Sequence, residues 1–161
     1  DRRLPDGRYI YLCYTRMARG TKDRISVEEP GSGHTLGRFQ GIIKLDTIEK
    51  RVSTVNFPRL MNGGEAAFIP RPGAKDEDDG WLTCFVTTLD VNSGELQTDI
   101  GVIDAKDMGN RKSKVPGLPD GFIWMQRLGY RVPWGLHTLF VNAEELQIRA
   151  ADGAEKKGVW G

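Results

Sequence analysis

Short apolar segments with a period of two recur along this chain and are separated by turn-forming dipeptides. Tyr9, Tyr11 and Cys13 recur at every second position, as do Val52, Thr54 and Asn56. Residues 81–89 and 100–103 form compact runs rich in β-branched and aromatic residues. Glycine-containing turn sequences such as Asp79-Gly80 stand between these runs. Because successive side chains of a strand point to opposite faces, the pattern predicts an all-β fold of short antiparallel strands.

Two segments depart from this pattern. Residues 143–151, AEELQIRAA, have the composition of a helix and precede a tail that contains Gly and Lys. Residues 109–128 mix Pro, Gly and charge, and we predict that they form a loop insertion with an apolar patch. The patch is expected to pack back on its own domain, with contact to a membrane or a partner as the alternative. Its members are Phe122, Ile123, Trp124 and Met125.

Charge and cysteine content argue against several classes of protein. Lys and Arg total 23 against 22 Asp and Glu, and neither sign gathers on one stretch, so a nucleic-acid partner is not expected. Cys13 and Cys84 each lie in an apolar run without a nearby Cys or His. We expect reduced core residues, with a single disulfide as the alternative. No apolar run approaches the roughly 18 residues that a membrane span needs.

The first residues, DRRLPDGRYI, contain neither an initiating Met nor a signal-peptide core, which indicates a fragment of a longer chain. The compartment is therefore undetermined. We expect the protein in the cytoplasm or at the periphery of a membrane. If a transit peptide precedes Asp1, we expect it in a plastid.

Two segments resemble known site signatures only in part. GSGHTLGR at 31–38 lacks the spacing of a phosphate-binding loop and is predicted to be a turn, with His34 facing solvent. The acidic run at 76–79 lacks the later Gly and Glu of an EF-hand and is predicted to be a solvated hairpin turn. There is no G-x-S-x-G elbow and no His close to either Cys, so nucleophilic catalysis has little support.

His137 and Glu65 are the remaining candidates for a functional site. His137 lies in RVPWGLHTLFV, and a histidine flanked by apolar residues is more often a satisfied core residue than a ligand. Glu65 follows two glycines and precedes an apolar strand, which predicts a strand-end carboxylate on the surface. The residue pattern alone favours a structural role for both.

A strand that ends at an aspartate and is followed by a turn occurs twice in the sequence. GIIKLDTIEKRV at 41–52 and IGVIDAKDM at 100–108 each end a strand at an aspartate, Asp46 or Asp104, and then turn. The spacing is compatible with two adjacent propeller blades plus an insertion. An immunoglobulin-type sandwich would give similar strand spacing, but its Cys…Trp…Cys arrangement is missing.

Three segments, taken in order, resemble the carotenoid cleavage oxygenase family, which includes retinal pigment epithelium isomerases and stilbene-cleaving dioxygenases. EAAFIPRPGAKDEDDGWL at 65–82 is similar to the family's Glu-Pro-x-Phe-Val-Pro-Arg-Pro-Gly-Ala stretch. IGVIDAKDM resembles the next strand with its Asp-Ala-Lys turn, and RVPWGLHTLFV resembles the closing Arg-Val-Pro-Tyr-Gly-Phe-His-Gly-x-Phe-Val. The likeness extends from about Gly7 to Val141.

The resemblance implies a fold and a metal site. Residues 1–142 would be an incomplete C-terminal portion of a seven-bladed β-propeller, and residues 143–161 a C-terminal tail. Such a propeller holds one Fe(II) on its axis by four histidines, beneath an apolar substrate tunnel. His137 would be one of these ligands, and Glu65 would accept the N–H of an iron-binding imidazole, with the histidine it orients left open. The other three ligands would precede Asp1.

The activity implied is that of a non-haem Fe(II) dioxygenase, which cleaves a C=C bond of a carotenoid, apocarotenoid or related polyene with O₂. The expected partners are the polyene and O₂, with peripheral membrane contact open and no obligate protein partner. Three positions depart from the family pattern: Ala66 stands for Pro, Leu136 for an aromatic residue and Thr138 for Gly. They leave open a non-catalytic polyene-binding relative or an inactive truncated product.

Overall fold

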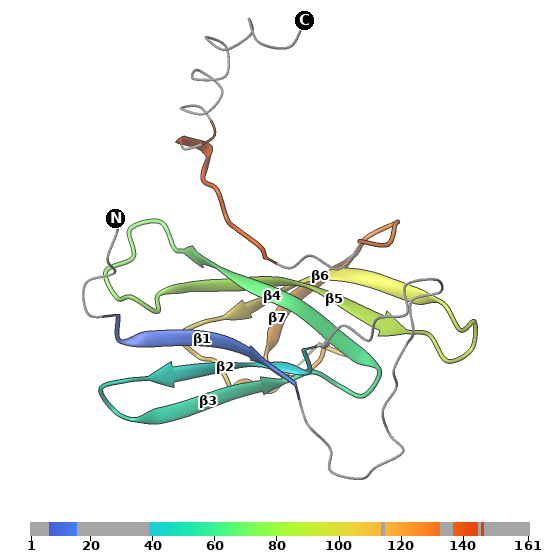
Figure 1. Cartoon of the computed structure of the whole chain (residues 1–161), viewed down its shortest axis with the longest axis horizontal. Coiled ribbons are helices and arrows are strands. Elements are labelled where there is room, and N and C mark those ends of the chain that lie inside the picture. Colours follow the sequence, from blue (N-terminus) through green and yellow to red (C-terminus); the bar gives the residue numbers. More distant parts are fainter. Residues whose placement is uncertain (1–6, 16–38, 114, 133–136, 145, 147–161) are drawn as a thin grey trace, which may run out of the picture.

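The computed structural model describes residues 7–15, 39–113, 115–132, 137–144 and 146 (Figure 1). Seven strands in these residues form two antiparallel sheets. The first sheet contains β1 (Tyr9–Tyr14), β2 (Gly41–Asp46) and β3 (Arg51–Asn56). The second contains β4 (Met61–Pro70), β5 (Gly80–Leu89), β6 (Leu96–Asp104) and β7 (Phe122–Arg127). The predicted all-β, antiparallel architecture is confirmed.

Within each sheet, every strand pairs with its neighbour in the chain. In the β1–β3 sheet, Ile42 lies opposite Cys13 on one side and Val55 on the other. The two sheets also meet through the backbone, where Phe39 forms an isolated bridge with Gly63 of β4. The short turns that join β2 to β3 and β5 to β6 favour this order, because a short connection can only join antiparallel neighbours.

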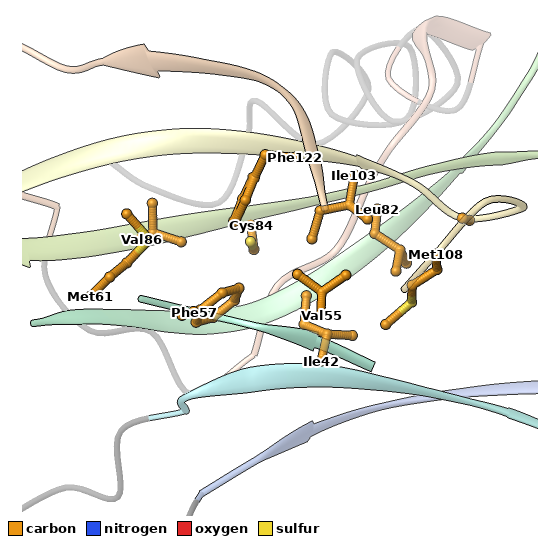
Figure 2. Close-up of a cluster of buried hydrophobic side chains, with 11 residues drawn as sticks. Ile42, Val55, Phe57, Met61, Leu82, Cys84, Val86, Ile103, Met108 and Phe122 are labelled. Atoms are coloured by element: carbon orange, nitrogen blue, oxygen red, sulfur yellow. The ribbon is translucent and has the colours of Figure 1, made fainter. Parts of the chain in front are cut away.

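Apolar side chains from the facing sides of the two sheets form one core (Figure 2). Ile42 and Val55 of the first sheet pack with Leu82 of the second, and all three are buried. The rings of Phe57 and Phe122 lie with their centroids 5.7 Å apart. Full burial of one side chain of this size contributes roughly 1.5–3 kcal/mol. The core therefore holds the sheets against each other.

The predicted loop insertion at 109–128 is wrong in its second part, because Phe122–Arg127 form strand β7. Phe122 is only 1% exposed, and its ring lies over Gly101 of β6, where no side chain competes for the space. Met125 also packs against the core. The expectation that the patch packs on its own domain is confirmed for these two residues, whereas Trp124 stays 47% exposed.

The two repeated aspartates end their strands in the same way. Oδ1 of Asp46 accepts hydrogen bonds from the backbone amides two and three residues later, at 3.1 and 3.0 Å. Oδ1 of Asp104 does the same at 3.0 and 3.3 Å. The other carboxylate oxygen of each binds an arginine, Arg8 at 2.7 Å and Arg71 at 2.8 Å. The repeat seen in the sequence is therefore a repeated turn with the same polar contacts.

The acidic run at 76–79 lies in the predicted β4–β5 turn, but it is not wholly solvated. Asp78 is buried and pairs with Lys44 of β2, Nζ to Oδ2 at 2.6 Å. The same ammonium donates to the Ala105 carbonyl at 2.9 Å and lies 4.2 Å from the centre of the Tyr9 ring. The prediction missed this pair because Lys44 comes from the other sheet, far from the run in sequence.

Outside the sheets, the predicted helix at 143–151 is described only at its start. Leu146 donates its backbone N–H to the Asn142 carbonyl at 3.0 Å, as in a helical turn. Residues 147–151 and His34 lie outside the described residues. Among those described, no helix is long and apolar enough to cross a membrane.

Candidate functional site

Strand β4 contains an irregularity at the position of Glu65. Gly63 pairs with Val86 and Ala66 pairs with Cys84, so the two residues between them face a single residue of β5. This arrangement is a β-bulge, which re-aims side chains and leaves backbone groups without ladder partners. Glu65 was predicted to be a strand-end carboxylate, and this is wrong: it lies inside the strand, on the bulge.

The two carbonyls of the bulge have side-chain partners from distant parts of the chain. The Gly64 carbonyl accepts from Sγ of Cys13 on β1, at 3.7 Å. The Glu65 carbonyl accepts from Oγ1 of Thr138, at 3.3 Å. The bulge therefore joins β4 to the other sheet and to the segment that carries His137.

The structure brings Glu65 and His137 together. Both carboxylate oxygens of Glu65 lie 3.2 Å from Nδ1 of His137, and Oε2 also accepts the backbone N–H of Thr138 at 3.3 Å. The side chain of Glu65 is 34% exposed, and that of His137 is 88% exposed. The sequence left open which histidine Glu65 would contact, and in the structure it contacts His137.

This geometry determines which ring nitrogen of His137 is available. A carboxylate only accepts hydrogen bonds, so its partner Nδ1 carries the proton. In a neutral imidazole the lone pair then lies on Nε2, which points away from the carboxylate. A histidine whose near nitrogen is held by a carboxylate, with the lone pair on its far nitrogen, is the arrangement of a metal ligand with its supporting group. The pair therefore suits a divalent metal such as Fe(II) as one ligand.

Other candidate groups contribute little to this site. Cys13 and Cys84 are free thiols, which confirms the expectation of reduced residues. Burial raises the pKa of Cys84 to about 12 and also raises the pKa of Cys13, so neither thiol forms a nucleophilic thiolate readily. No group of three or more His, Cys, Asp or Glu that could hold a metal occurs among the described residues.

Sequence reasoning missed two residues of the site. Thr138 was noted only as a departure from a glycine, and its hydroxyl and amide both bind Glu65. Cys13 was placed in the core without its contact to Gly64. The signal for Thr138 was a hydroxyl side chain directly after the candidate histidine, whereas no local pattern links Cys13 to a strand that begins about 50 residues later.

The described part of the chain is thus an all-β fold of two antiparallel sheets in which a carboxylate contacts a histidine. A family model described as retinal pigment epithelial membrane protein matches residues 4–142. The carotenoid 9,10(9',10')-cleavage dioxygenase of Crocus sativus is 42% identical over 92 residues, 56% of this chain and 14% of that protein. The apocarotenoid-15,15'-oxygenase of Synechocystis is 35% identical over 77 residues, 47% of this chain and 15% of that protein. The chain belongs to the carotenoid cleavage oxygenase family, which includes the retinal pigment epithelial membrane protein.

Solved structures of the Synechocystis apocarotenoid oxygenase share the fold. A single-residue variant superimposes with a TM-score of 0.53 and 26% identity, over 81% of this chain and 21% of that one. A cobalt-substituted form gives the same values. These structures are β-propeller enzymes. The chain spans about one seventh of the length of the curated relatives it matches, 14% of the first.

Proposed function

We propose that this chain is the C-terminal part of a non-haem Fe(II) dioxygenase that cleaves a C=C bond of a carotenoid, apocarotenoid or related polyene with O₂. The observation that carries the proposal is the contact between Nδ1 of His137 and both carboxylate oxygens of Glu65, at 3.2 Å. The names of the relatives, which are carotenoid and apocarotenoid oxygenases, support the reaction class.

In this proposal, Nε2 of His137 is one of four iron ligands. The other three come from parts of the protein outside residues 1–161, as expected for a chain that spans 14% of its relative's length. The bound iron supplies the O₂ chemistry of double-bond cleavage. Glu65 keeps the proton on Nδ1 and fixes the direction of the ring, so the nitrogen that faces the metal stays unprotonated.

The exposed faces of the sheets support a larger propeller, in which residues 1–142 form the last blades and residues 143–161 a tail. Ile10, Leu12 and Val52 are exposed on the outer face of the β1–β3 sheet. Phe85 and Trp124 are exposed on the β4–β7 sheet. Blades of a propeller pack face to face, so outer faces of this composition would be covered by neighbouring sheets.

A non-catalytic polyene-binding relative was the alternative, based on the departures at Leu136 and Thr138. Leu136 lies outside the described residues. Thr138 does not disturb the pair, because its amide and hydroxyl both bind Glu65. We therefore prefer the enzyme.

The test is the H137A variant of the full-length protein that carries this chain, with H34A as the matched control because His34 is the chain's other histidine. We expect H137A to lose iron and cleavage activity, and H34A to keep both. Iron is measured by metal analysis, and cleavage by chromatography of the polyene products. An H137A variant that keeps its iron and full activity would overturn the proposal.

A further inference from the structure

Thr138 makes two contacts with Glu65, one to each end of that residue. Its backbone N–H donates to Oε2 of the carboxylate at 3.3 Å, and its hydroxyl donates to the Glu65 carbonyl at 3.3 Å. Thr138 is half-buried beside the exposed ring of His137. The residue that follows the histidine therefore binds both the side chain and the backbone of the glutamate that supports the histidine.

The hydroxyl of Thr138 reaches a carbonyl of the bulge, where the register of the strand ladder shifts. Glu65 lies on the bulge between the pairs Gly63–Val86 and Ala66–Cys84. A backbone carbonyl at such an irregularity can take a side-chain hydroxyl as its hydrogen-bond partner. Thr138 supplies that partner, and its branched Cβ restricts the side chain to few rotamers, so the hydroxyl is held where the carbonyl lies.

We propose that Thr138 is a positioning residue for the metal site: its hydroxyl locks the β4 bulge so that the Glu65 carboxylate stays directed at Nδ1 of His137. The inference rests on the proposed function, because it takes His137 as a metal ligand. Backbone N–H donation to Oε2 is available to any residue at position 138 except proline. The hydroxyl contact requires Thr or Ser, and the glycine expected here from the family pattern cannot make it.

A purely structural role for Thr138 predicts a different outcome from a positioning role. If the side chain only fills space, valine, which has the same shape, should serve as well as threonine, and serine should serve less well. If the hydroxyl positions Glu65, serine should serve and valine should not. The two variants therefore separate packing from hydrogen bonding.

The experiment compares T138V and T138S in the full-length protein loaded with Co(II), with T54V in the other sheet as the matched threonine-to-valine control. The rate of cobalt release to a chelator and the visible absorption spectrum of bound Co(II) are measured. We expect T138V to release cobalt about 10-fold faster with an altered spectrum, while T138S and T54V stay close to the wild-type rate. Melting curves confirm that each variant is folded.

The outcomes that would overturn the inference are distinct from failure of the proposed function. Wild-type cobalt release from T138V, together with loss of cobalt from H137A, would overturn the positioning role and leave the metal site intact. Retention of cobalt by H137A would overturn both. Slow release from T138V with fast release from T138S would assign Thr138 to packing.

Discussion

Glu65 and His137 are separated by 72 positions in the chain, yet both carboxylate oxygens of the first lie 3.2 Å from Nδ1 of the second. A bulge in β4 aims the carboxylate, and the segment after β7 returns the histidine to it. Thr138 and Cys13 hold the two carbonyls of that bulge. The bulge that carries Glu65 therefore has two long-range contacts, one from Cys13 of β1 and one from Thr138 after β7.

Removal of the Glu65 carboxylate should weaken metal binding. E65A leaves Nδ1 of His137 without an acceptor, whereas E65Q keeps one acceptor oxygen without the charge. We expect metal affinity to fall about 10–100-fold in E65A and less in E65Q. Iron content after dialysis of the full-length protein measures the effect, with E95Q on the exposed β5–β6 turn as the control. Full iron retention by E65A would contradict the role assigned to Glu65.

Breaking the Lys44–Asp78 ion pair should destabilise the protein strongly. D78A would leave the Lys44 ammonium buried without its carboxylate, which costs about 3–5 kcal/mol in such pairs. The double variant K44M/D78L replaces both charges by apolar groups and should recover much of that loss. Urea unfolding of the full-length protein measures both. A double variant no more stable than D78A would show that the charges themselves are needed.

An alanine at Gly101 should not be tolerated. A Cβ at this position would lie 2.4 Å from Cε1 of Phe122, whose ring is buried in the core. We expect G101A to lower the free energy of unfolding by about 1–3 kcal/mol. G129A is the matched control, because nothing lies within 4 Å of a Cβ built there. Equal stability of the two variants would contradict the placement of β7 against β6.

Asp46 should make the protein sensitive to acid. Its hydrogen bond with the Arg8 guanidinium holds the pKa of Asp46 well below its usual range. A carboxyl group whose pKa is lower in the folded state stabilises above its unfolded pKa of about 3.9, and this contribution is lost as the pH falls further. We expect D46N to lower the melting temperature at pH 7 and to flatten its decline between about pH 4 and pH 2. E95Q should leave the wild-type profile unchanged.

Local patterns predicted most of the strands, because period-two alternation and glycine turns act over a few residues. Strand β7 was missed because Pro, Gly and charge surround a short apolar run, and only the space above Gly101 shows where Phe122 packs. The burial of Asp78 was missed because its partner, Lys44, lies in the other sheet. Such contacts depend on how the sheets meet, which alternation does not encode.

For the site, the residues came from the family resemblance and their arrangement from the structure. His137 and Glu65 were named in the sequence, but their mutual contact was not. The bulge has no clear sequence signal beyond the two glycines before Glu65. The double contact of Thr138 joins residues 73 positions apart, so it is seen only in the structure.

Because each strand pairs with its neighbour in the chain, the sheets can assemble in the order in which the ribosome makes them. Each hairpin can close once its second strand has emerged. The Glu65–His137 contact is different, since at about 5–20 residues per second the histidine is made roughly 4–14 s after the glutamate. The carboxylate is therefore present on β4 for seconds before the imidazole that it binds has been made.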